Sequence, residues 1–299
     1  MLRRWLTVLG LVAALAPAAS AQTIDDIINK NIAARGGLDK LKSIQTVRMS
    51  GKMSVGPGFE APLTMEMKRP NSMRMSFTLQ GLTGIQAYDG TNGWAVMPFS
   101  SGKKDPEAMS ADDIKEIADQ ADIDGPLVDY KAKGNTVELL GKESVEGTDA
   151  WKIKVTLKSG TVRTLFIDAD SYLEIRGEGK RMMRGTEMEY EGSIGDYKAV
   201  DGVMFPYSIE NGVKGHPEKQ KITFDKIEVN PTLAADLFTM PAKSDSSATA
   251  AKGDVKAQAA GDAKTADATA AAATAASDTT KTATAKTVKK TSKKSASKP

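Results

Sequence analysis

The chain has 299 residues, of which 26% are charged, a formal net charge of +3 and no cysteine. Without cysteine it can form no disulfide and no cysteine-ligated metal site, and it carries no acylated cysteine anchor. Residues 243–299 hold 11 Lys and 5 Asp and residues 1–21 hold two Arg and no acid, so residues 22–242 carry a net charge of −5. We therefore expect an acidic folded part, stabilised by its core alone.

The two ends of the chain have compositions unlike the middle. Residues 1–21 combine Arg3 and Arg4, a short apolar run and the ending Ala19-Ser20-Ala21, the pattern of a secretory signal peptide. Residues 243–299 contain no Ile, Leu, Phe, Tyr or Trp, and such a segment buries too little apolar area to offset its ordering entropy. The sequence predicts a signal peptide over 1–21, one exported domain over 22–242 and a disordered Lys/Ala/Thr-rich tail over 243–299.

The first predicted element after residue 21 is an amphipathic helix. Thr23 is a typical N-cap, an isoleucine stripe follows at helical spacing, and Gly36 ends the pattern. A short helical turn is expected around Leu38–Leu41. Beyond Ser43 the hydrophobic period changes to two, which predicts strands.

The next three strands can be aligned because residues paired across an antiparallel ladder lie on the same face. A three-residue loop at 56–58 pairs Met53 with Ala61, Gly51 with Leu63, Met49 with Met65 and Val47 with Met67. A loop that has Pro70 near its start then pairs Met67 with Met75, Met65 with Phe77, Leu63 with Leu79 and Thr64 with Thr78. All odd-numbered positions of these strands form one apolar face, rich in methionine.

Further strands follow, interrupted by one helix. A hairpin turns at 89–93, and Ser110 caps an amphipathic helix that carries Ile114 and Ile117. Later strands are expected at 137–140, 151–157, 162–167, 172–176, 187–191, 203–209 and 222–229. The predicted class is mainly β (α+β), with one antiparallel meander of about 10–11 strands. A sheet of this length with one apolar face must curl, and two or three amphipathic helices are available to cover its concave face.

The residues of catalytic sites are scarce. The single histidine, His216, sits in a Gly/Pro-flanked turn, and Ser or Cys hydrolases need a histidine base. Glu187, Glu189 and Glu191 share one strand face and could form a metal site or an acid pair, although such alternation is typical of solvated surface. We expect no enzyme activity, cofactor or metal.

The basic tail is the remaining charged feature. Its last nineteen residues hold seven Lys and no acid. An exported chain without aromatic or Arg residues in this segment is not expected to bind nucleic acid. The tail either tethers the protein to anionic lipid or cell-wall polymer, or has no specific role.

Two stretches, "MKRPNSMRMSF" and "YDGTNGWAVMP", resemble the LolA/LolB-type periplasmic outer-membrane lipoprotein carrier superfamily. The residues that carry the resemblance are Lys68, Arg69, Pro70, Asn71, Asp89, Gly90, Trp94 and Pro98. "FIDADSYLEI", "DYKAVDGVMFP" and "NPTLAADLFTMP" resemble the later strands and closing segment of related lipoprotein-sorting proteins. The resemblance implies an unclosed half-barrel, lidded by helices, that carries lipoprotein acyl chains between inner- and outer-membrane components. It also implies an arginine that locks the lid, for which Arg48 is the nearest candidate despite its polar-face position.

Two classes of function remain open. The leading hypothesis is a carrier of lipid or lipoprotein acyl chains whose cavity is lined by Val47, Met49, Leu63, Met65, Met67, Met73, Met75, Phe77 and Leu79. Its lid would use Ile27, Ile28, Ile32, Ile114 and Ile117. Alternatively these side chains form an ordinary core. The second functional hypothesis is an envelope-stress sensor or scaffold of the same fold, tethered to the envelope through its basic tail.

Overall fold

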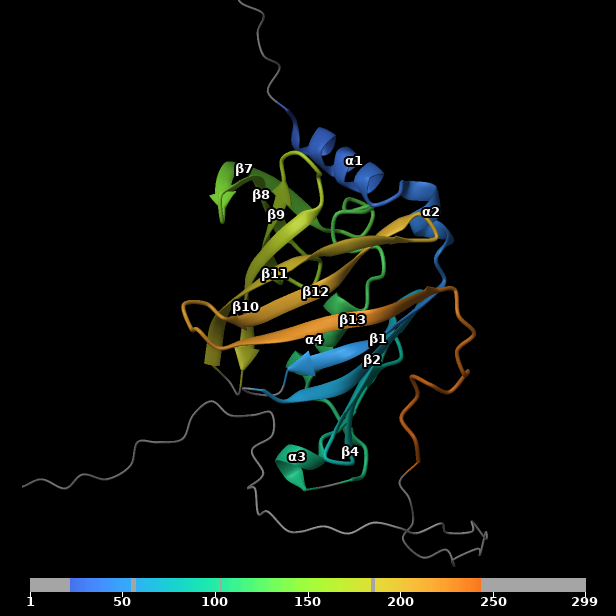
Figure 1. The fold of residues 1–299 in the computed structure, drawn as a ribbon. Helices are drawn as coiled ribbons and strands as arrows, with labels where there is room; N and C mark the ends of the chain where they lie inside the picture. Colours follow the sequence, from blue (N-terminus) through green and yellow to red (C-terminus); the bar gives the residue numbers. More distant parts are fainter. Residues whose placement is uncertain (1–21, 55–57, 103, 184–185, 243–299) are drawn as a thin grey trace, which may run out of the picture.

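A computed structural model describes residues 22–54, 58–102, 104–183 and 186–242. The predicted signal peptide and tail therefore lie outside the described residues. The described part forms one antiparallel sheet that curls around helices (Figure 1). Its strands are β1 (Thr46–Ser54), β2 (Glu60–Lys68), β3 (Ser72–Leu79), β4 (Leu82–Tyr88), β5 (Gly93–Val96), β6 (Glu107–Ala108), β7 (Thr136–Val145), β8 (Thr148–Thr156), β9 (Val162–Asp168), β10 (Glu174–Met183), β11 (Thr186–Val200), β12 (Val203–Val213) and β13 (Lys219–Val229).

Within the described residues, four helices accompany the sheet: α1 (Ile24–Ala34), α2 (Leu38–Ser43), α3 (Pro98–Ser101) and α4 (Ala111–Gln120). The predicted N-caps Thr23 and Ser110 are confirmed: Ser110 accepts the Asp113 amide at the start of α4, and Thr23 forms a reciprocal capping box with Asp26 at the start of α1. In Figure 1, α1 and α2 lie at one end of the sheet and α4 lies behind β13 and β1. None of the helices within the described residues has the length and apolar character needed to cross a bilayer.

The strand order explains why α4 covers the concave face. The sheet runs β6-β5-β4-β3-β2-β1-β13-β12-β11-β10-β9-β8-β7, so the first and last strands pair and the two edges are β6 and β7. The segment between these edges, which contains α4, must cross from one open edge to the other. The predicted fold class, an unclosed and helix-covered half-barrel, is confirmed. Its 13 strands exceed the 10–11 expected.

The extra strand length lies mainly in the second half of the chain. The strand expected at 187–191 is the start of β11, which runs for 15 residues. The strand expected from Tyr172 begins at Glu174, because Tyr172 has a positive φ of 57° and belongs to the β9–β10 turn. β11 contains glycine and charged residues, so its sequence lacks the alternation of apolar and polar residues from which a strand is predicted.

The predicted register of β1 and β2 is confirmed from Met53–Ala61 to Val47–Met67. The predicted register of β2 and β3 is wrong by two residues, since Met65 pairs with Met75 and Leu63 with Phe77. The three loop residues are Arg69, Pro70 and Asn71, so Pro70 is central. Arg69 is drawn out of the ladder because its guanidinium is held by distant groups described below. A shift of two keeps every side chain on its predicted face.

The core consists of two apolar clusters. The first lies under α4 and joins side chains of β1–β3 with those of β12 and β13, including Val47, Leu63, Met67, Phe77 and Phe224. The second lies under α1 and joins Ile27 and Ile28 to Leu127 and to side chains of β8 and β9, among them Ile153, Val155, Leu165 and Ile167. Each half of the sheet therefore has its own helix and its own core.

Replacing Gly51 with alanine is expected to lower the free energy of unfolding by about 3 kcal/mol. The register of β1 and β13 shifts at Ser50–Gly51, and an added Cβ would overlap the Thr223 carbonyl oxygen and press on the Phe224 Cα at 2.7 Å. Both obstacles are backbone and cannot rotate away. Gly195→Ala is the matched control, because an added Cβ there meets nothing within 4 Å. Urea unfolding of both variants measures the difference, and equal stabilities would contradict a close backbone approach at Gly51.

Candidate functional site

The methionine-rich face is divided into rows of different burial. Met49, Met65 and Met75 pair across β1–β3 and form one row, which we call the methionine strip. All three are half-buried. The rows on either side are buried: Val47, Met67 and Met73 on one side, Leu63 and Phe77 on the other. Because a strip in the middle of a packed face retains exposure, the covering elements among the described residues do not close over it fully.

Several further half-buried apolar side chains belong to the same core as the strip. Met97, Phe99, Met109, Ile114, Tyr207 and Ile209 all pack against the first core while keeping some exposure. Phe99 of α3 stacks on Phe77 with 5.5 Å between ring centroids. Methionine side chains adapt their shape at low energy, and such surroundings suit an apolar guest of variable form.

The structure separates the predicted lid residues into two groups. Ile117 is buried and Ile114 half-buried, both of α4 and both in the first core. Ile27 and Ile28 lie in the second core under α1, away from the methionine strip, and Ile32 packs against both cores. Leu79, the last predicted lining residue, pairs with Leu82 at the tip of the β3–β4 hairpin and is half-buried.

Arg69, at the turn between β2 and β3, is the centre of an ionic network. Its guanidinium makes a bidentate pair with Asp124, including Nη1 to Oδ2 at 2.9 Å, and Nη2 also donates to the Leu41 carbonyl at 2.9 Å. Lys42 Nζ lies 2.6 Å from Asp124 Oδ2 and 2.7 Å from Asp129 Oδ2. Arg35 Nη1 donates to the Asp124 carbonyl at 2.7 Å. The loop that follows α4 is therefore tied to α1, to α2 and to the β2–β3 turn.

The electrostatics of Asp124 follow from these contacts. Its side chain is only 2% exposed. Burial alone would raise the pKa of this carboxyl, but hydrogen bonds from Arg69 and Lys42 outweigh burial and lower the pKa to about 2. Asp124 is therefore ionised at neutral pH, and the network is held by full charges.

The other residues of the family-like motif hold turns and ends in place. Asn71 Nδ2 donates to the Ala118 carbonyl of α4 at 3.3 Å, so the motif turn contacts α4 itself as well as the loop after it. Trp94 is buried and its indole donates to the Phe238 carbonyl at 2.8 Å. The remaining motif residues are structural: Lys68 ends β2, Asp89 accepts amides of its own turn, Gly90 accepts the Tyr88 hydroxyl, and Pro98 begins α3.

Arg48, the candidate for a lid-locking arginine, lies on the outer face. It pairs with Glu66, which also pairs with Arg74. The contacts between the motif turn and the α4 region come from Arg69 and Asn71 instead. The sequence pointed to Arg69 through its motif but could not identify its partner, because nothing in "DIDGP" marks Asp124 as buried.

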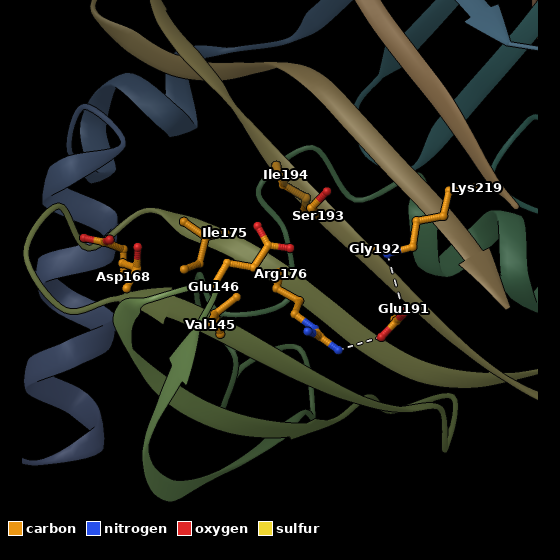
Figure 2. Close-up of a pocket in the computed structure, with 11 residues that line it drawn as sticks. Val145, Glu146, Asp168, Ile175, Arg176, Glu191, Gly192, Ser193, Ile194 and Lys219 are labelled. Atoms are coloured by element: carbon orange, nitrogen blue, oxygen red, sulfur yellow. Dashed lines mark hydrogen bonds and ion pairs between the residues drawn. The ribbon is translucent and has the colours of Figure 1, made fainter. Parts of the chain in front are cut away.

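A pocket of about 280 Å³ lies on the face of the sheet opposite the helices (Figure 2). Arg176 lines it and shares the face of Phe166, which alternates with the core residues Leu165 and Ile167. Figure 2 shows Arg176 and Lys219 pointing toward Glu191, and both form ion pairs with it. Since these charges neutralise one another, the pocket does not resemble the predicted apolar site.

The candidate acidic site on β11 is also an ion-paired surface. Lys180 pairs with Glu187 and Glu189. His216 is exposed in the β12–β13 turn. These groups lie on β10, on β11 and in the β12–β13 turn, not on the methionine face.

Comparison with known proteins supports the fold. No protein-family model matches the sequence, and no curated protein matches it. An outer membrane lipoprotein-sorting protein domain from Vibrio parahaemolyticus is 11% identical, with 72% of this chain and 95% of that chain covered and a TM-score of 0.50. A DUF1329 family protein from Desulfovibrio piger is 12% identical, with 73% and 98% covered and a TM-score of 0.52.

A LolA superfamily protein from Nitrosomonas europaea is 15% identical, with 73% and 98% covered and a TM-score of 0.49. The likeness to the Vibrio and Desulfovibrio structures is one of fold, since the identities are low. The chain thus has the lipoprotein-sorting type of fold that its sequence resembles.

Proposed function

We propose that this protein is a periplasmic carrier that binds the acyl chains of a lipoprotein or another lipid on its concave apolar face, for transport to the outer membrane. The observation that carries the proposal is the methionine strip: Met49, Met65 and Met75 remain half-buried between two buried rows. A row of adaptable apolar side chains that its own fold leaves uncovered is a site for an apolar guest. The proposal includes no catalytic step.

The lid and the fold agree with this proposal. α4 spans the open side of the half-barrel. Asn71 holds its C-terminal part through the Ala118 carbonyl, Arg69 holds the loop after it through Asp124, and the Met109 amide just before α4 donates to the Gly93 carbonyl at 2.9 Å. The name of the Vibrio domain of similar fold refers to lipoprotein sorting. A signal peptide over residues 1–21 would deliver the protein to the compartment in which such cargo travels.

Native mass spectrometry of the protein purified from its own periplasm tests the proposal directly. We expect a population carrying lipid mass that organic extraction removes. Purified protein without lipid that also fails to bind an apolar fluorescent probe would overturn the carrier proposal and favour an ordinary core.

Met65→Trp is expected to weaken binding of an apolar probe about tenfold, because the indole fills the space over the strip. Thr64→Trp is the matched control, since Thr64 is the neighbouring half-buried residue on the opposite face. Fluorescence titration of both variants measures the effect, and thermal unfolding confirms that each is folded. Equal weakening by both substitutions would argue against binding at the strip.

A further inference from the structure

A polar cluster lies on the concave side of the sheet, near the C-terminal end of α1. Glu174 pairs with Ile167, and Arg163 occupies the same face of β9 as Leu165 and Ile167, which pack under α1. Arg35 follows the last turn of α1. Tyr197 of β11 donates its hydroxyl to the Glu174 carbonyl at 2.9 Å. Four polar groups from four elements thus meet on an otherwise apolar face.

Glycines leave room for these side chains to approach one another. Gly177 pairs with Leu165 and with Gly192, and Gly179 pairs with Arg163. A methyl group built on Gly177 would lie 3.5 Å from Glu174 Oε1, so the carboxyl reaches across Gly177. Glu174 therefore reaches over Gly177, and the Tyr190 ring of β11 lies over Gly179, with its hydroxyl 2.6 Å from the position of an added Cβ.

The polar groups of this cluster are not satisfied by one another. Arg163 Nε is buried and has no hydrogen-bond partner among the described residues. Burial raises the pKa of Glu174 to about 7, and Arg35 and Arg163 lower it only through their charges. Both Glu174 and Arg163 nevertheless retain partial exposure. Unpaired buried donors are costly, so such a group in a native fold indicates a missing partner.

Apolar residues occupy the sheet between the cluster and the methionine-bearing strands. Ile209 pairs with Ile222 and Ile222 with Met53; Ile209 keeps some exposure, and Ile222 and Met53 are buried in the first core. Four strand spacings separate β10 from β1, which is about 19 Å along the sheet. That span is comparable to the length of an extended long-chain acyl group.

We propose that Arg163, Arg35 and Glu174 form a head-group site that binds the acidic oxygen group, carboxylate or phosphate, of an amphiphile whose chain lies along the apolar face. The two guanidinium groups supply donors and positive charge, and a protonated Glu174 supplies a third donor. This inference rests on the proposed carrier function and specifies the chemical class of its ligand: an acidic amphiphile in preference to a neutral one.

The test compares ligands of one chain length that differ in head group: hexadecanoate, hexadecyl phosphate and hexadecanol, with inorganic phosphate as a chain-free probe. In competition with an apolar fluorescent probe, we expect one or both acidic amphiphiles to bind at least about tenfold more tightly than the alcohol. Inorganic phosphate should not compete. Arg163→Gln should remove the preference for the acids over hexadecanol.

Lys154→Gln is the control for loss of one positive charge, since Lys154 lies on the neighbouring strand, on the outer face, and pairs with Glu138. It should keep the preference. Glu174→Gln keeps shape and removes the negative charge, so at about pH 8 it should bind the acids more tightly than the wild type does. Arg35, Arg163 and Tyr197 are the titratable or charged groups that face Glu174.

Each outcome separates the two proposals. Equal binding of acids and alcohol by the wild type overturns the head-group site and leaves the carrier proposal standing. Binding of none of the amphiphiles overturns both. If Arg163→Gln fails to fold, as thermal unfolding would show, Glu174→Gln decides: an affinity for acids no higher than that of the wild type at about pH 8 overturns the head-group site.

Discussion

Replacing Asp124 with asparagine is expected to lower the free energy of unfolding by about 3–5 kcal/mol. The substitution keeps the shape of the side chain but removes the negative charge that Arg69 and Lys42 share. Arg69 would then remain partly buried, with a neutral amide as its neighbour. The loop after α4 would lose the contact that ties it to α2 and to the β2–β3 turn.

Asp129→Asn is the matched control. Asp129 also pairs with Lys42, but its side chain is 44% exposed, and an exposed ion pair contributes little. Urea unfolding should therefore show a loss of free energy of unfolding that is several times larger for Asp124→Asn than for Asp129→Asn. If Asp124→Asn is as mild as Asp129→Asn, the buried network adds nothing net to the fold.

The pKa of Asp124 predicts how the free energy of unfolding depends on pH. The pKa of Asp124 is lowered in the folded state to about 2 from its ordinary value of 3.8, because hydrogen bonds from Arg69 and Lys42 outweigh burial. The contribution of the Asp124 carboxylate to the free energy of unfolding is therefore complete above its pKa in the unfolded chain. The contribution is lost as pH falls through the folded pKa, a decrease of about 2 kcal/mol between about pH 4 and pH 2. Unfolding measured across this range should show that change in the wild type, and Asp124→Asn should lack it.

The methionine face shows how far local patterns reach. Period-two alternation and the loop at 56–58 fix the pairing of β1 with β2, because both signals lie within the hairpin. The pairing of β2 with β3 depends on Arg69, whose partners Asp124 and Leu41 are remote in sequence. The odd or even position of a residue therefore predicts its face of the sheet correctly, whereas the exact register of β2 and β3 depends on a tertiary contact.

The candidate site divides in the same way. The sequence predicts that Met65 and Met75 lie on the apolar face. Their half-burial depends on how the helices and loops pack over that face, which the alternation does not predict. The cluster of Arg163 and Glu174 depends on the β9–β10 register and on its irregularity between Glu174 and Arg176. The sequence gives no period or spacing that would bring these two residues together.

A disulfide between α4 and the sheet is expected to abolish most lipid uptake, at least about tenfold in rate, if α4 must move for cargo to enter. Gly93→Cys with Ile114→Cys is the suitable pair, because a Cβ on Gly93 would lie 2.9 Å from Ile114 Cγ1. The chain has no native cysteine, so the engineered bond is the only one that oxidation can form. Reduction should restore uptake within the same sample.

The matched control is a disulfide that leaves α4 free. Thr78→Cys with Thr83→Cys joins the exposed β3–β4 pair, whose hydroxyl oxygens are 3.1 Å apart. Both oxidised variants should unfold at least as high in temperature as the wild type, since each cross-link constrains the unfolded chain. Only the link to α4 should block uptake of an apolar probe. Equal uptake by the oxidised α4 variant and the oxidised control would mean that cargo reaches the methionine strip without displacing α4, through the open edges of the half-barrel.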